Sequence, residues 1–463
     1  MSEKTADRVE KDFLGEKRIP REAYWGIHTE RARENFPISG YRMNPSLIKA
    51  LAVVKKACAE ANLELGYLEE KKAQAIFQAC DEIGGGNFSD QFPVDALQGG
   101  AGTSSNMNLN EVIANRAAEL LGGERGTGLV HPLEDVNLHQ STNDVYPTAV
   151  KVAAIFLLRD LSQAIATLQG SFQRKEKEFA AIVKMGRTEL QEAVPITLGA
   201  EFSAFGEALS RDRWRTFKCE ERLRVVNIGG TAVGTGLSSP RSFIFLVIEK
   251  LRDLTGLGLS RGENLLDATA NTDPFVEVSG ILKAHASNLI KIGNDLRLLH
   301  LLVEIELPKL QAGSSIMPGK VNPVLLEAVI QAAIKVMADD LVVTEACSRS
   351  TLQINEFLPL LAHSLLEALD ILINVNSILA EHVAEIKARE EKCREYFEQS
   401  PMTITAFLPH IGYDRAAALL REFDSSGRKN LREFLSEKLG KDLVDRILSP
   451  YHLVALGYRE KKD

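Results

Sequence analysis

Long stretches with helical spacing of apolar residues are the feature that most restricts how this chain can fold. They cover 144–180, 192–225, 275–302, 324–348 and 353–388, with few breaks inside them. Apolar residues recur at three- and four-residue intervals, which is the pattern of amphipathic helices. A helix of ~30 residues is ~45 Å long and must bury its apolar face against several partners. The pattern predicts an all-α fold with an elongated multi-helix protomer, and it favours an oligomer; shorter, kinked helices are the alternative.

Shorter elements are expected on both sides of these long helices. Three amphipathic segments precede them, at 45–65, 68–84 and 105–121. The start of the chain, to about Gly40, is polar and is expected to be an irregular arm, and the segment after Ser400 carries only brief helices. We therefore predict three regions: a mostly helical N-terminal domain at 1–141, a central long-helix bundle at 142–400, and a small helical C-terminal domain at 401–463.

Composition narrows the class of protein. The 463 residues are 45% hydrophobic and 25% charged with a net charge of -8, so a large core is possible and nothing indicates binding to nucleic acid. The five cysteines are scattered without a C-x-x-C pair, which argues against disulfides and zinc ribbons. No signal peptide begins the chain and no uncharged apolar run reaches ~18 residues. We expect a soluble, cytoplasmic protein with no membrane partner.

Polar residues replace the apolar pattern in four stretches. These lie at 102–108, 140–144, 186–191 and 313–323. Serine, threonine and asparagine before a helix commonly cap its free N–H groups. The same geometry binds anions, because the N–H groups and the helix dipole face the ligand. Several such ends meeting at one point would hold a dicarboxylate.

The last stretch, GSSIMPGKVNP at 313–323, is the richest in chemistry. It resembles a phosphate-binding P-loop but fails that pattern, because Val321 follows Lys320 where a hydroxyl residue is required. The chain also has no Gly-x-Ser-x-Gly elbow, which argues against a serine hydrolase.

These residues do resemble a known family. The 313–323 loop is similar to the signature loop of the class II fumarase/aspartase superfamily, and the likeness extends over nearly the whole chain. DFLG at 12–15, YWGIHT at 24–29, GTSSN at 102–106 and LPKLQA at 307–312 are more similar to its aspartase branch than to its fumarase branch.

The resemblance implies a fold, an assembly and a reaction. Its members are homotetramers whose central domains form a bundle of about twenty helices, with each active site built from three subunits. The implied reaction is reversible elimination of ammonia from L-aspartate to give fumarate, through an aci-carboxylate intermediate, without cofactor or metal. The alternatives are hydration of fumarate to malate and a related carbon–nitrogen lyase reaction on a substituted aspartate.

The same resemblance assigns roles to individual residues. Ser314 is the implied general base, and Glu327 stands behind the site as a family carboxylate. The residues implied to bind the substrate or its developing charge are Thr103, Ser141, Thr142, Asn143, Thr188, Glu189, Ser315, Lys320 and Asn322.

Two departures from the family pattern affect this site. Glu189 stands where fumarases have a histidine, so we expect it to favour an ammonium group. The segment between Arg297 and Glu304 is several residues short, and we expect the loop before the site to be reshaped. The accessory anion site of fumarases is not expected, because HPLE at 131–134 only half matches its pattern.

Overall fold

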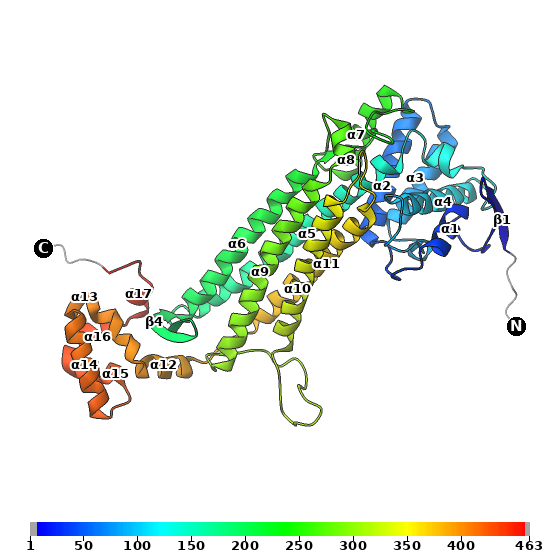
Figure 1. Ribbon diagram of the computed structural model, residues 1–463. Coiled ribbons are helices and arrows are strands. Elements are labelled where there is room, and N and C mark those ends of the chain that lie inside the picture. Colours follow the sequence, from blue (N-terminus) through cyan, green and yellow to red (C-terminus); the bar gives the residue numbers. More distant parts are fainter. Residues whose placement is uncertain (1–6, 459–463) are drawn as a thin grey trace. The chain divides into compact units, whose positions relative to one another are not determined.

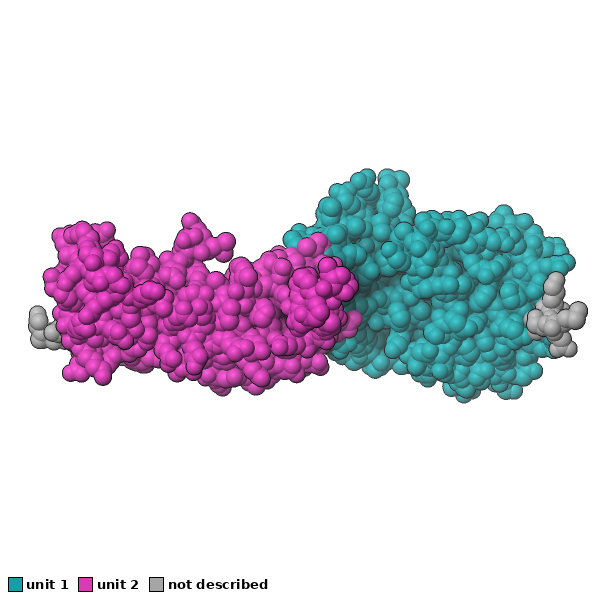
Figure 2. Space-filling view, turned by 90° about the horizontal axis from the view of Figure 1, so that it is seen from below, with its two compact units in different colours: residues 1–161, 215–284, 335–372 teal, residues 162–214, 285–334, 373–463 magenta. Residues whose placement is uncertain are grey.

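The computed structural model describes residues 7–458 of the chain, which form two compact units. Unit 1 comprises the chain up to 161 with 215–284 and 335–372; unit 2 comprises 162–214, 285–334 and the chain from 373 (Figure 2). The predicted all-α class is confirmed, since the described strands form only short two-stranded sheets. The predicted three-region division stays a prediction.

Five long helices carry the chain through both units (Figure 1). They are α5 (Thr142–Glu178), α6 (Leu198–Leu223), α9 (Asp273–Leu301), α10 (Val324–Ser348) and α11 (Leu358–Ala384). Two predicted starts were too early: the helix expected from 192 begins only at Leu198, because 191–197 forms a strand, and the helix expected from 353 begins at Leu358. The β-branched residues Val194, Ile196 and Thr197 favour that strand.

Shorter elements complete unit 1. They are β1 (Arg8–Asp12), β2 (Gly15–Ile19), α1 (Ile27–Asn35), α2 (Pro45–Glu64), α3 (Glu70–Gly84), a 3₁₀ turn (Ser89–Gln91), α4 (Thr103–Leu120), a π-helical turn (Pro132–Val136), β5 (Val225–Val226), α7 (Arg241–Thr255), β6 (Ser260–Arg261) and α8 (Leu265–Ala270). Helix α2 contacts both α3 and α7. Its start follows from sequence, since the Asn44 side chain accepts the Ser46 N–H and Pro45 occupies the first helical turn.

The prediction of an irregular N-terminal arm was wrong. Residues 7–40 contain the β1–β2 hairpin and helix α1, whereas residues 1–6 of that segment lie outside the described part. The hairpin strands read RVEKD and GEKRI, so their alternation is mostly of charges and gives little apolar signal. Arg31 of α1 holds this hairpin through a two-pronged ion pair to Asp12, at 2.7 and 2.8 Å.

Unit 2 is completed by one hairpin and the C-terminal helices. The elements are β3 (Val183–Thr188), β4 (Gln191–Thr197), β7 (Ile305–Glu306), β8 (Lys387–Ala388), α12 (Glu390–Gln399), a 3₁₀ segment (Pro401–Phe407), α13 (Leu408–Ile411), α14 (Tyr413–Ser426), α15 (Leu431–Leu439), α16 (Lys441–Ile447) and α17 (Pro450–Leu453). Met185 of β3 is buried in one cluster with Phe397, Phe407, Leu419 and Phe434. The β3–β4 hairpin is therefore packed against the C-terminal helices.

Helix α11 is the one described helix that is long and apolar enough to cross a membrane. Its most apolar window is 61% buried within the structure, as is usual for a core helix.

Candidate active site

The start of helix α5 in unit 1 is closed by a reciprocal cap. The Asn143 N–H donates to Ser141 Oγ at 3.3 Å, and the Ser141 N–H donates to Asp144 Oδ1 at 3.0 Å. As in a capping box, the Asp144 side chain accepts the N–H of the first residue of Ser-Thr-Asn-Asp, whereas the Ser141 side chain accepts the N–H of the third residue instead of the fourth. The hydroxyl of Ser141 therefore serves the helix end and faces the same side as its free N–H groups.

The second carboxylate oxygen of Asp144 joins this helix end to the 229–236 loop. It accepts the N–H groups of Gly229 at 3.1 Å and Thr231 at 2.9 Å. Burial raises the pKa of the Asp144 carboxyl to about 6, although these N–H groups and Lys55 act in the opposite direction. The buried carboxyl is thus the link between two polar segments far apart in sequence.

Asparagines complete the link between α5 and that loop. Pro147 has no N–H, so the Asn143 carbonyl lacks its helical donor and instead accepts Asn227 Nδ2 at 2.9 Å. The Asn143 side chain donates to the Ala232 carbonyl at 2.7 Å. The predicted substrate residue Asn143 is therefore held at both its carbonyl and its side chain.

The start of helix α4 meets the same region. Asn106 Nδ2 donates to Thr142 Oγ1 at 3.1 Å and to Asn137 Oδ1 at 3.2 Å. Fully buried Lys55 donates to Asn137 Oδ1 at 2.7 Å, and burial lowers the pKa of its ammonium group to about 8. The structure thus joins two of the four predicted polar stretches, 102–108 and 140–144, around a buried cation.

Thr103 stands exposed at the first residue of α4. Its hydroxyl donates to the Gly100 carbonyl at 2.7 Å. The preceding Gly102 has φ +96°, and a Cβ there would lie 2.6 Å from the Tyr146 ring. Only glycine fits this approach, so Gly102 lets α4 begin directly against α5.

Thr188 and Glu189 lie at the tip of the β3–β4 hairpin in unit 2. Glu189 and Leu190 form its two-residue turn, with φ of +51° and +62°. Such turns normally contain asparagine and glycine, so two ordinary side chains there are strained. All three residues are exposed. The helix-cap interpretation of 186–191 is therefore wrong, because this stretch turns between strands.

The 313–323 loop in unit 2 is closed at its neck. The Gly313 N–H donates to the Lys320 carbonyl at 2.7 Å, and Asn322 Nδ2 donates to the Gly313 carbonyl at 2.9 Å. Ser314 Oγ accepts the N–H groups of Ile316 at 3.2 Å and Met317 at 2.9 Å. Most of the loop is exposed, including Ser315 and Lys320. Two N–H groups aimed at one hydroxyl oxygen favour negative charge on that oxygen.

A cavity of about 390 Å³ lies against the base of this loop. Asn322 and Pro323 line it from the loop, with Lys309 and Arg389 among the charged residues of its wall. Arg389 is paired with Glu306 at 2.6 Å. The 313–323 loop therefore has open space next to Asn322 and Pro323.

Comparison with known proteins places this chain in a family. Residues 15–338 match the family described as lyase. The chain belongs to the fumarase/aspartase superfamily of lyases. This lyase is 46% identical to an aspartate ammonia-lyase from Bacillus sp, over 98% of this chain and 99% of that protein. It is 43% identical to an aspartate ammonia-lyase from Helicobacter pylori, over 98% of this chain and all of that one.

Solved structures agree with these relatives. The lyase matches the fumarate lyase:delta crystallin from Brucella melitensis bound to cobalt, with a TM-score of 0.92, 45% identity and coverage of 97% and 100% of the two chains. It also matches a class II fumarase from Schistosoma mansoni, with a TM-score of 0.89, 32% identity and coverage of 97% and 99%. The expected fold family is confirmed.

The predicted site residues of this lyase fall into two sets. Thr103, Ser141, Thr142 and Asn143 belong to unit 1, whereas Thr188, Glu189, Ser314, Ser315, Lys320, Asn322 and Glu327 belong to unit 2. Glu327 is half-buried in the first turn of α10. In unit 1 the starts of α4 and α5 are joined by the hydrogen bond from Asn106 to Thr142, and in unit 2 the predicted residues lie on two separate segments, the β3–β4 turn and the 313–323 loop with the start of α10. Between residues 7 and 458, no group of three or more His, Cys, Asp or Glu side chains is placed to hold a metal ion.

Sequence inspection missed the residues that hold these groups in place. Asp144 was within reach, because Ser-x-x-Asp before an apolar run is the sequence signature of a capping box. Lys55 and Asn137 gave no such signal, since a lysine in an amphipathic helix normally faces solvent. Their role depends on contacts between residues far apart in the chain.

Proposed function

We propose that this lyase is an aspartate ammonia-lyase, which removes ammonia from L-aspartate and gives fumarate. The observation that carries the proposal is the environment of Ser314, whose Oγ accepts two backbone N–H groups, from Ile316 and Met317. A serine hydroxyl is a weak acid, and donors on its oxygen favour the ionised form that a general base requires. The names of the full-length relatives support the same reaction.

The proposed reaction begins with proton removal. The Ser314 alkoxide takes a proton from the β-carbon of aspartate, and the electron pair moves into the adjacent carboxylate, which becomes a doubly charged aci-carboxylate. The intermediate then forms the carbon–carbon double bond as the bond to the amino nitrogen breaks, and ammonia leaves. The proton on Ser314 returns to solvent, and the atoms balance as aspartate giving fumarate and ammonia.

Stabilising the extra charge of the intermediate is the main task of the site. We assign Thr103, Ser141, Thr142 and Ser315 to the developing oxyanion, where one good donor is worth about 10²–10³ in rate. Lys320 and Asn322 are assigned to the α-carboxylate. Thr188, Asn143 and Glu189 are assigned to the amino group, and Glu327 stands behind the loop.

The proposal includes a homotetramer with active sites shared by three subunits. Its support is that the two sets of site residues lie in different units of one chain. Large apolar side chains are also exposed on the long helices: Trp214 and Phe217 on α6, and Ile334 and Leu341 on α10. A contiguous exposed apolar patch on a monomer marks a protein interface, and the two residues of each pair lie on one face of their helix. Further copies of this chain cover these side chains, and the tetramer acts in the cytoplasm.

One assay separates the proposed reaction from its alternative. The protein is incubated with fumarate plus ammonia and, separately, with fumarate alone, and the products are identified. Aspartate in the first reaction only is the expected result. Malate in the second would instead assign the protein as a fumarase, and neither product with fumarate would direct attention to substituted aspartates.

A further inference from the structure

A buried glutamate stands where the chain is shorter than its family pattern. Helix α9 ends at Leu301, and three residues later the chain reaches Glu304, which is 0% exposed. The residue before it, Val303, has φ +60°, which is strained for a β-branched side chain. A carboxylate without access to water needs nearby positive charge to remain ionised.

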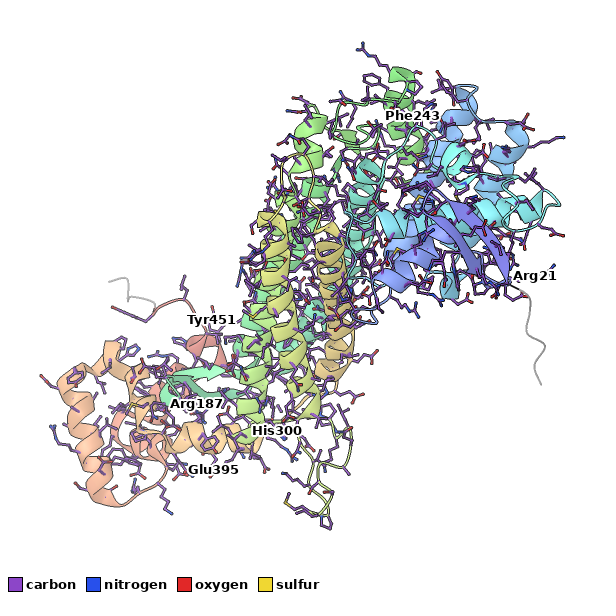
Figure 3. All side chains as sticks on the ribbon, turned by 45° about the vertical axis from the view of Figure 1, so that its right-hand side comes forward. Arg21, Arg187, Phe243, His300, Glu395 and Tyr451 are labelled. Carbon is purple, nitrogen blue, oxygen red and sulfur yellow. The ribbon has the colours of Figure 1, made fainter. Side chains whose placement is uncertain are left out.

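Both partners of this carboxylate come from strand β3. Arg187 Nη1 lies 2.6 Å from Glu304 Oε1, and Lys184 Nζ lies 2.9 Å from Glu304 Oε2. Figure 3 labels Arg187 on the hairpin and His300 shortly before Glu304. One carboxylate therefore fixes two points of the strand that leads to Thr188.

A β-bulge interrupts the pairing of the hairpin beside these cations. Met185 pairs with Pro195 and Arg187 with Glu192, so the single residue Gly186 of β3 faces two residues of β4, and the extra residue belongs to β4. A Cβ on Gly186 would lie 2.9 Å from the Val194 carbonyl oxygen, so glycine allows the two strands to approach closely here.

The base of the hairpin is held further on both sides. Lys184 also pairs with Glu201 of α6 at 2.6 Å, and the Arg187 guanidinium lies 5.3 Å from the Tyr396 ring centre on α12. The tip differs, since Leu190 is 74% exposed. The direction of the strained turn is thus set at its base.

The backbone of Glu304 is itself anchored. Its N–H donates to the Leu299 carbonyl at 3.0 Å, and its carbonyl accepts the Arg389 N–H at 2.9 Å. The next residues, Ile305 and Glu306, pair with β8 and lead on towards the 313–323 loop. Glu304 therefore ties the hairpin to the segment that carries Ser314.

We propose that Glu304 is a positioning residue, which acts through Lys184 and Arg187 to hold the Thr188–Glu189 turn in place for the substrate's amino group. This inference rests on the proposed function, which assigns that turn to the amino group. It predicts an effect on substrate binding, because the proton-abstracting Ser314 is held by its own loop.

Replacement of Glu304 by glutamine tests the proposal in the full-length protein. Glu304→Gln keeps the shape but removes the charge that holds both cations. We expect KM for aspartate to rise about tenfold while kcat changes less than about threefold, since small displacements of a positioning group weaken binding. Amide hydrogen exchange in 186–191 should also become faster.

A second buried glutamate provides the matched control. Glu220 in unit 1 also holds two cations, with Arg159 and Arg224 at 2.8 and 2.9 Å. Glu220→Gln should lower the melting temperature but leave KM and exchange at 186–191 as in the parent. If Glu304→Gln behaves like this control, Glu304 is only structural and the proposal is overturned.

A second variant keeps the test decisive if Glu304→Gln does not assemble. Arg187→Lys retains the charge but loses the planar guanidinium, and a KM rise of about threefold supports the proposal, whereas a parental KM overturns it. Failure of the proposed function is seen separately, because the parent then releases no ammonia from aspartate. In that case amide hydrogen exchange at 186–191 is the deciding measurement. If Glu304→Gln and Glu220→Gln exchange at the same rate there, the inference is overturned.

Discussion

The polar helix ends of unit 1 and the 313–323 loop of unit 2 carry the same kinds of side chain but hold them in opposite ways. Around Thr142 and Asp144, hydrogen bonds run from α5 to α4 and to the 229–236 loop, and both side chains are buried. In the loop, the hydrogen bonds made by Ser314 and Asn322 join the loop to itself, and Ile316 is 84% exposed.

In the proposed reaction this difference separates two tasks of the active site. A group that stabilises developing charge must be fixed before the reaction, because reorganising it would cost part of the gain. A group that covers the substrate must let it enter, and glycine-containing loops suit such motion. In the proposed reaction, unit 1 supplies the fixed donors and the loop supplies the mobile base.

The largest expected effect comes from removing the proposed general base, Ser314, in the 313–323 loop. Ser314→Ala should lower kcat by about 10²–10⁴ while the oligomer and the melting temperature stay as in the parent, because the Ser314 hydroxyl accepts its hydrogen bonds from Ile316 and Met317 of the same loop. Steady-state kinetics and size-exclusion chromatography provide the measurements, with Ser425→Ala on the exposed side of α14 as control. Near-parental turnover would remove Ser314 from the mechanism.

Removing the charge of Asp144 from the hydrogen-bond network of unit 1 should affect both stability and activity. Asp144→Asn turns an amide N–H₂ towards donors that now bond a carboxylate, at a cost of about 1–3 kcal/mol per unpaired donor. We expect a lower melting temperature together with a fall in kcat/KM of about 10- to 100-fold. The exposed Asp160→Asn on the same helix is the control. Lost stability with unchanged kinetics would show that this network does not position the site.

A substitution at the tip of the β3–β4 hairpin tests substrate preference rather than rate. Glu189→His should reduce the preference for aspartate over malate by about three- to tenfold, because an exposed carboxylate attracts the ammonium group only modestly. The ratio of kcat/KM for the two substrates, measured in low and high salt, checks this. An unchanged ratio would contradict the role assigned to Glu189.

The smallest effect concerns the Asp95 carboxylate of unit 1, which accepts hydrogen bonds from Ser39 and Leu97. Burial raises the pKa of the Asp95 carboxyl, but hydrogen bonds from Ser39 and from the N–H groups of Leu97 and Gly40 outweigh it and bring the pKa to about 2. A folded pKa below the unfolded value of 3.8 means that this stabilisation is present above about pH 4 and is lost as pH falls towards 2.

Melting curves of the parent and Asp95→Asn check this pH dependence. We expect the parent to melt about 2–4 °C higher at pH 5–7 and the difference to shrink below pH 4. A difference that stays constant down to pH 3 would exclude the Asp95 charge as its cause.

Local patterns predicted much of this protein correctly. The long helices were found to within a few residues because their apolar spacing is repeated many times, and each turn reports the same face. The β1–β2 and β3–β4 hairpins were missed, because their short strands carry charges and bulges instead of apolar alternation. The turn at Glu189 and Leu190 was missed for a similar reason, since neither residue is one that such turns prefer.

By itself the sequence determined the helical class, the family and the residues of the 313–323 loop, because all three depend on neighbours in the chain. The tertiary structure alone decided that Asp144 meets Gly229 and Thr231, and that Glu304 meets Lys184 and Arg187. These partners are far apart in sequence, and burial gives each charge its importance by removing the water that would otherwise compensate it. A local sequence pattern does not indicate which distant charged residue will stabilise a buried charge.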